Sequence, residues 1–303
     1  GAVDPDAFAA ANLLVGNDAD AAAVEMTLVG PTLLVRERVT IGLAGGDLGG
    51  IAQPGGRRLV PGAAYRLSAG TTISFAGRVS GGARGYLALP GGVDAPPVLG
   101  SRSTCLAAGF GGLEGRRLEA GDIIRAATPD MARPELRLPD ADATPAAAVV
   151  RIVAQRDADR DDHEALDALV SAPWSVAPDS DRMGLRLTGP TIRTSADTVV
   201  SHGVTWGTIQ LPPGGAPIVL LADHQPTGGY PVVAVAIAAD RGILGAIGPG
   251  DEVRFTEATL EEAVRALRAK HAERAALRET LAAAARALRD DERWSDLSEW
   301  AGG

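Results

Sequence analysis

Short β-type runs separated by turn residues constrain the fold of this chain more than any other feature. Between residues 24 and 93 the runs are VEMTLV, PTLLV, VTIGLA, AAYRLS, TTISFAG and GYLALP, with Gly, Pro and Asp between them. Runs of the same kind return after residue 146, as AVVRIVAQ, LRLTG, TVVSHGV, GTIQL, APIVLLA, YPVVAVAIAA and EVRF. Short, evenly spaced strands are typical of β-barrels and β-sandwiches. The sequence therefore predicts a mainly β (α+β) fold.

The β-type runs fall into two groups, which indicates two domains. Residues 128–146 between them are rich in Pro, Asp and Ala, as expected of a boundary. MTLVGPTLLV, from Met26, resembles LRLTGPTIRT, from Leu185, which favours two related β-domains, although Gly-Pro-Thr is also a common turn sequence. APIVLLA and YPVVAVAIAA are apolar on both faces, and we expect them to be central strands. The predicted domains are residues 1–127 and 128–256.

Helical patterns lie on either side of the β-type runs. Residues 4–16 read as a short helix that ends at a glycine. Residues 257–303 form a predicted helical tail, in which Thr259 and Glu262 have the spacing of a capping box. We expect the apolar stripe of this tail to pack on the second domain, with a partner protein as the alternative. Its residues are Leu260, Val264, Leu267, Leu277, Leu281 and Leu288.

Charge and lysine usage exclude several classes of function. The formal net charge is −9 at pH 7 and no basic patch is visible, which argues against nucleic-acid binding. Lys270 is the only lysine among 29 basic residues, so the chain has no Gly-Lys-Ser/Thr P-loop and is not expected to carry biotin. If ATP or biotin is used, we expect another subunit or a non-standard site to hold it.

The cysteine and histidine content bears on compartment and metals. The single cysteine, Cys105, excludes an internal disulfide and fits a reducing environment. No apolar run reaches the roughly 18 residues of a membrane span, and no secretory signal is visible. We therefore expect a cytoplasmic protein. No metal site is expected, because the four histidines are not spaced as ligand pairs.

The first candidate site is a glycine-rich run from Gly85 to Gly112. It has seven glycines and three prolines, but Asp94 and Arg102 are its only charged residues. Such a run predicts a folded loop whose backbone can approach a ligand closely. Ser101, Arg102 and Ser103 together suit a carboxylate or a phosphate. The alternative is a packing loop whose arginine pairs with an internal carboxylate.

The second candidate site is the segment LADHQPTGGYP, residues 221–231, between two apolar runs. Its imidazole, on His224, is suited to general acid or base catalysis. The alternative is a hydrogen-bonded turn that joins two core strands. The nearby Ser-Asp-Arg sequence, residues 180–182, suggests a turn with an internal ion pair. The site residues expected in the second segment are Asp223, His224, Gln225, Thr227, Gly228, Gly229 and Tyr230.

These segments carry a resemblance to a known family. The blocks GAVDPDAFAAANLLVGN, RGYLALPGGVDAPPVLGSRST, GFGGLEGRRLEAGD, SDRMGLRLTGP and LADHQPTGGYP look like the family called allophanate hydrolase subunit 2, Kip-inhibitor antagonist or 5-oxoprolinase C subunit. The chain is also similar to half of the carboxyltransferase domain of urea carboxylase. It departs from the family pattern at His224, Pro226 and Val232, where positive side chains are lost or weakened.

The resemblance implies two cyclophilin-like β-barrel domains and a multi-subunit enzyme. The leading hypothesis is a subunit of an ATP-dependent 5-oxoprolinase, acting with a subunit 1 or Kip-inhibitor-like partner and an amidohydrolase-like third subunit. Arg102 would hold a carboxylate or phosphorylated intermediate, and Asp223 and His224 would position or transfer protons. Tyr86 and Tyr230 would form walls of the site. The alternatives are a carboxyltransferase that uses biotin on another protein, and a non-enzymatic antagonist of a kinase inhibitor.

Overall fold

A computed structural model describes residues 1–130, 133–139, 148–155, 163–193 and 199–300 of the chain. For residues 289–300 it describes the helical backbone and not the side chains. The chain forms two compact units. We call residues Asp6–Ala143 with Ala272–Gly303 the sheet unit, and Gly1–Pro5 with Thr144–His271 the barrel unit. Each unit is built from two separate stretches of the chain. Neither unit is therefore one continuous segment, whereas the predicted division has three continuous segments, at residues 1–127, 128–256 and 257–303.

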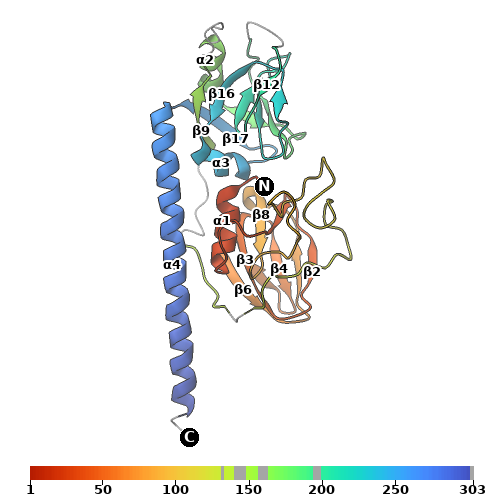
Figure 1. Cartoon of the computed structure of the whole chain (residues 1–303), viewed down its shortest axis with the longest axis vertical. Coiled ribbons are helices and arrows are strands. Elements are labelled where there is room, and N and C mark those ends of the chain that lie inside the picture. The colour runs from red at the N-terminus through yellow and green to blue at the C-terminus, as the bar shows by residue number, and fades with distance from the viewer. Residues whose placement is uncertain (131–132, 140–147, 156–162, 194–198, 301–303) are drawn as a thin grey trace. The chain divides into compact units, whose positions relative to one another are not determined.

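The sheet unit contains two antiparallel four-stranded sheets, with strand orders β1-β8-β3-β6 and β2-β7-β4-β5. Their inward-facing side chains, among them Ile41, Ile73 and Leu87, form one apolar core. The elements, labelled in Figure 1, are α1 (Pro5–Leu14), β1 (Val24–Thr27), β2 (Thr32–Leu34), β3 (Val39–Asp47), β4 (Gly50–Gln53), β5 (Arg57–Leu59), β6 (Ala63–Leu67), β7 (Thr72–Phe75) and β8 (Ser80–Ala88).

The barrel unit closes seven strands in the order β10-β11-β14-β13-β16-β9-β17. Its core includes Val150, Trp174, Ile209 and Phe255, each at most 1% exposed. The elements are β9 (Ala148–Ala154), α2 (His163–Ser171), β10 (Trp174–Val176), β11 (Gly184–Thr188), β12 (His202–Gly203), β13 (Thr208–Gln210), β14 (Ile218–Leu220), β15 (Thr227–Gly228), β16 (Val232–Ala236), a 3-10 turn (Ala238–Asp240), α3 (Arg241–Ala246) and β17 (Glu252–Glu257).

These elements confirm the mainly β prediction and refine it. β14 and β16, which come from the two runs that are apolar on both faces, each pair with two neighbouring strands, as expected of central strands and as every strand of the closed barrel does. The second half of the chain closes into a barrel as predicted. The first half arranges its strands in two sheets around one apolar core, which is the other arrangement that short, evenly spaced strands predict. Local spacing does not decide between the two, because strand order depends on long-range pairing.

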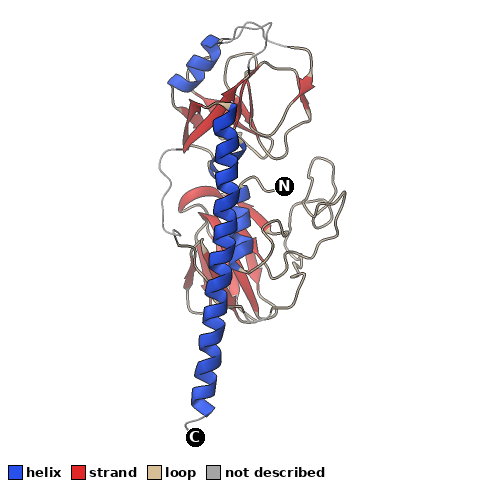
Figure 2. Cartoon of the chain, turned by 60° about the vertical axis from the view of Figure 1, so that its left-hand side comes forward, coloured by secondary structure: helices blue, strands red, loops and turns tan. Residues whose placement is uncertain are grey.

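The predicted tail is a single helix, α4 (Leu260–Trp300), drawn in blue in Figure 2. Its capping box is confirmed, since the Thr259 amide donates to the Glu262 carboxylate at 2.8 Å and the Glu262 amide donates to the Thr259 hydroxyl at 3.2 Å. Among the described residues, no helix combines the length and the apolar content that crossing a bilayer requires.

The predicted packing of α4 is wrong for the part after His271, whereas the part up to His271 belongs to the barrel unit. Leu281 is 3% exposed in a cluster with Leu13, Leu14 and Leu136 of the sheet unit, whereas Leu260 is 69% exposed. The helix has 41 residues and is about 60 Å long. Helical spacing identifies the apolar face of such a helix, but not which domain that face meets.

Candidate functional site

The glycine-rich run divides between a strand and an irregular loop. Gly85 to Ala88 belong to β8, and the chain from Leu89 to Thr128 contains no helix or extended strand, as the tan segments of Figure 2 show. Isolated bridges fold this loop back on itself, pairing Val98 with Ser101 and Cys105 with Phe110. The prediction of a folded loop is therefore confirmed for the part after β8.

Arg102 lies exposed on this loop. Its Nη1 donates a hydrogen bond to the Ala95 carbonyl, and the amide of Ser103 donates to the Ser101 hydroxyl at 3.1 Å. Among the described residues, no carboxylate pairs with Arg102, which argues against the packing-loop alternative. The remaining N–H donors of the guanidinium can therefore bind a carboxylate or phosphate from outside the chain.

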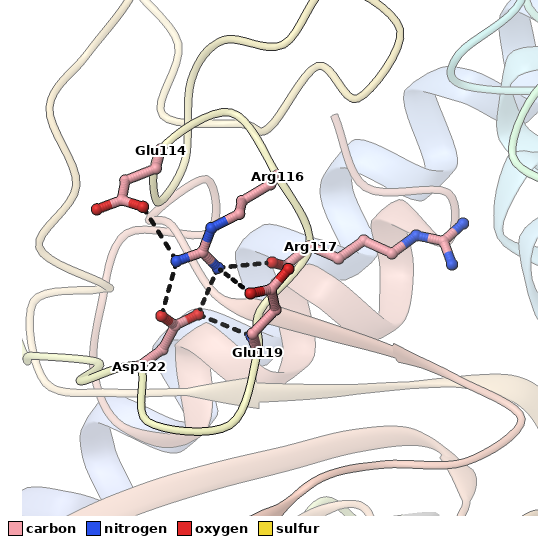
Figure 3. Close-up of polar contacts among 5 residues, drawn as sticks. All are labelled: Glu114, Arg116, Arg117, Glu119 and Asp122. Carbon is pink, nitrogen blue, oxygen red and sulfur yellow. Dashed lines mark hydrogen bonds and ion pairs between the residues drawn. The ribbon is translucent and has the colours of Figure 1, made fainter.

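A neighbouring arginine of the same loop has its charge neutralised internally. Arg116 donates to both oxygens of Asp122, at 2.8 and 2.9 Å, and to Glu114 at 3.0 Å, while Asp122 also accepts from the Glu119 amide at 2.7 Å (Figure 3). The hydrogen bonds from Arg116 lower the pKa of Asp122 to about 2. The Asp122 carboxylate in turn raises the pKa of Arg116. This cluster fixes the loop, whereas the Arg102 guanidinium stays open to a ligand.

Tyr86 lies on β8, just before the loop begins in the sequence, and is buried, at 1% exposed. Its hydroxyl donates to Glu25 at 2.7 Å, and its ring meets Phe8 edge to face with centroids 5.9 Å apart. In this structure Tyr86 therefore offers no surface to a ligand, and its role as a wall of the site stays a prediction.

The second candidate segment, residues 221–231, belongs to the barrel unit and follows β14. The Asp223 carboxylate accepts hydrogen bonds from Nε and Nη2 of Arg182, at 2.8 and 3.1 Å. The sequence predicts an ion pair for Arg182 within its own turn, and this prediction is wrong. Asp181 instead accepts hydrogen bonds from the amides of Met183 and Gly184, at 2.8 and 3.3 Å. The turn and the segment are thus held together by an ion pair between loops.

His224 is half-buried and its tautomer follows from one contact. Nδ1 lies 2.6 Å from the carbonyl oxygen of Gln225. A carbonyl can only accept, so Nδ1 carries a proton, and Nε2 is the ring nitrogen left to exchange a proton with a ligand. The ring of Tyr230 is 39% exposed in the same segment. This arrangement can accept and return a proton at His224 Nε2.

The Thr-Gly-Gly part of the segment forms a short ladder. Thr227 and Gly228 make up β15, which pairs with β12, so that His202 lies opposite Gly228. Gly229 accepts a hydrogen bond from the Val199 amide at 2.9 Å. The alternative of a hydrogen-bonded turn between core strands thus describes part of the segment, while its exposed side chains remain available to a ligand.

The predicted site residues lie in two different units. Tyr86, Ser101, Arg102 and Ser103 belong to the sheet unit, and residues 223–230 belong to the barrel unit. The structure brings Asp223 together with Arg182 but leaves the combination of both sets in one site as a prediction. Among the described residues, no group of three or more His, Cys, Asp and Glu side chains is placed to hold a metal ion.

Comparison with known proteins places this fold. Residues 1–257 match the family described as carboxyltransferase domain, subdomain A and B. The C subunit of the 5-oxoprolinase of Escherichia coli K12 is 38% identical over 267 residues, which cover 88% of this chain and 84% of that protein.

Solved structures show the same architecture. The protein TTHA0988 superposes with a TM-score of 0.76 at 34% identity, covering 84% of this chain and 50% of that one. The chain therefore spans about half the length of that relative. The urea carboxylase of Kluyveromyces lactis superposes with a TM-score of 0.81 at 24% identity, covering 91% of this chain and 26% of that one, which shows the fold alone. The matched residues, 1–257, include both candidate segments, and the chain belongs to the family of carboxyltransferase domains with subdomains A and B.

Proposed function

We propose that this chain is a subunit of a heteromeric, ATP-dependent amide hydrolase of the 5-oxoprolinase type, which opens 5-oxoproline to glutamate. The observation that carries the proposal is the 38% identity with a 5-oxoprolinase C subunit over most of both chains. The name of that relative supports a hetero-oligomer. The partners we propose are a subunit 1 or Kip-inhibitor-like protein and an amidohydrolase-like third subunit, and the single cysteine fits a cytoplasmic location.

The proposed roles follow the contacts of each side chain. Arg102, with donors left over from its single hydrogen bond to Ala95, binds the carboxylate of the substrate or a phosphorylated intermediate. Asp223 is oriented by Arg182 and positions the ring amide. His224 accepts at Nε2 a proton from the water whose oxygen bonds to the amide carbonyl carbon, and returns it to the ring nitrogen as the carbon–nitrogen bond breaks.

ATP supplies the driving force for opening the ring when the assembled enzyme binds it. This chain offers no P-loop for it, because Lys270 is its only lysine and lies in α4. We therefore assign ATP binding to the partner subunits. The residues of this chain bind and orient the substrate and move the proton.

The proposal is tested by co-expressing the chain with its partner subunits and measuring glutamate released from 5-oxoproline. Arg102→Ala is expected to lower turnover by about tenfold or more while the complex still assembles, because a charge-assisted hydrogen bond is lost. Arg117→Ala is the matched control, since Arg117 is also exposed on this loop and Figure 3 shows its side chain pointing away from the Arg116 cluster. Equal turnover by Arg102→Ala and Arg117→Ala would show that Arg102 does not bind the substrate.

A second candidate function is carboxyl transfer from biotin, which the family description as a carboxyltransferase domain favours. Biotin would have to be attached to another protein, because Lys270 is the only lysine of this chain. Avidin-detectable biotin in the purified complex, together with carboxylation of urea, would favour this function over hydrolysis. Partner binding without any turnover would instead favour the non-enzymatic antagonist.

A further inference from the structure

Gln210, at the end of β13, has a buried side-chain amide. The residue is 1% exposed, and its Nε2 has no hydrogen-bond acceptor among the described residues. A buried donor that stays unpaired destabilises a fold, so native proteins rarely keep one. An acceptor from outside the chain that forms a hydrogen bond with this donor would explain why the fold keeps it.

The amide points at the second candidate segment. A Cβ placed on Gly228 would lie 2.2 Å from Gln210 Nε2, so the amide nitrogen occupies the space above the glycine. Gly228 belongs to β15, and its pairing with β12 at His202 fixes its position. The glycine therefore leaves room for the Gln210 side chain beside Thr227 and Gly229.

The pairing of β13 with β16 shifts register next to Gln210. Ile209 lies opposite Ala234 of β16, but Gln210 lies opposite Val232, which leaves one residue of β16 unmatched. Such β-bulges redirect side chains and are common beside active sites. Ile209 is buried in the barrel core, whereas Gln210 turns its amide towards the segment that carries Asp223 and His224.

We propose that Gln210 is a substrate-binding residue, whose Nε2 donates a hydrogen bond to an acceptor oxygen of a ligand bound beside residues 227–229. A carbonyl or carboxylate oxygen fits this donor, and 5-oxoproline has both. The inference rests on the proposed function, because that function supplies the ligand of residues 221–231.

The test uses the assembled complex and 5-oxoproline. Gln210→Met keeps the length of the side chain but removes the donor, and is expected to raise KM by about tenfold. Its midpoint of unfolding in urea is expected to stay equal or to rise, because an unpaired buried donor is removed. A purely structural role predicts the opposite, namely a lower midpoint with an unchanged KM.

Thr208→Val is the matched control on the same face of β13. The Thr208 hydroxyl accepts a hydrogen bond from the Thr205 amide at 3.0 Å, so this variant is expected to lose stability and keep its KM. Gln210→Glu, which replaces the donor with an acceptor, is expected to raise KM at least as much as Gln210→Met and serves if the methionine variant does not assemble. An unchanged KM in an active complex would overturn the inference alone. A wild-type complex that releases no glutamate would overturn the proposed function, and the inference with it.

Discussion

The carboxylate of Asp223 accepts two hydrogen bonds from the guanidinium of Arg182, a residue 41 positions earlier in the chain. Both side chains are about one-quarter exposed, so the pair is partly shielded from solvent. A bidentate geometry restrains both partners. The pair therefore holds the start of the second candidate segment against the turn before β11.

The first prediction concerns this ion pair. Asp223→Asn keeps the shape of the side chain but removes its charge, and we expect the free energy of unfolding to fall by about 1–2 kcal/mol. Urea denaturation measures the change. Asp179→Asn is the control, because Asp179 pairs with Arg186 at 3.3 Å with both side chains more than half exposed. Its effect is expected to stay within about 0.5 kcal/mol. Equal losses in the two variants would contradict the restraining role.

The second prediction separates two adjacent glycines. Gly228→Ala would place a methyl group 2.2 Å from Gln210 Nε2, which is the end of a flexible side chain, and we expect a loss of about 1 kcal/mol in the free energy of unfolding. Gly229→Ala meets its nearest atom at 3.5 Å and is expected to change stability by less than about 0.5 kcal/mol. Gln210→Ala should restore most of the stability lost in Gly228→Ala. Additive losses in the double variant would show that the glycine does not accommodate the amide.

The third prediction concerns the packing of α4. Leu281→Ala removes a buried side chain from the cluster with Leu13 and Leu14, and we expect a loss of about 2–4 kcal/mol in the free energy of unfolding. Leu260→Ala, at a position 69% exposed on the same helix, is expected to change it by less than about 0.5 kcal/mol. A larger loss of stability at Leu260 than at Leu281 would contradict this packing and would favour the predicted contact of the apolar stripe with the second domain.

The fourth prediction concerns pH and the Arg116 cluster. Hydrogen bonds from Arg116 lower the pKa of Asp122 from 3.8 to about 2. The stability that the Asp122 carboxylate contributes is therefore present above the unfolded value of 3.8 and lost as pH falls towards about 2. An NMR titration of the carboxyl carbon should show a midpoint near 2, and Arg116→Met should return it towards 3.8. The same midpoint with and without Arg116 would contradict this cause.

The relation between sequence and structure differs from element to element. β14 and β16 were predictable as central strands, because apolar residues on both faces have only one stable location in a sheet. The capping box at Thr259 was predictable because its contacts lie within one helical turn. The packing partner of Leu281 was not predictable, because that contact joins residues far apart in the chain. The choice between a barrel and two sheets in the first half stayed open for the same reason.

The candidate site shows the same limit. The low charge of residues 85–112 singled out Arg102, and a group of polar side chains between two apolar runs singled out the segment that carries Asp223. The partner of Asp223 was hidden, because Arg182 stands in a sequence that also reads as an isolated turn. Gln210 gave no sequence signal beyond a polar residue at the end of an apolar strand. Its importance emerges only from its burial and from its contact with Gly228.

The central claim is tested most directly by measuring glutamate released from 5-oxoproline by the purified complex of this chain with its partner subunits. We predict release that requires ATP and that stops when this chain is omitted. Release by the partner subunits alone, or no release by the full complex with ATP, would contradict the account.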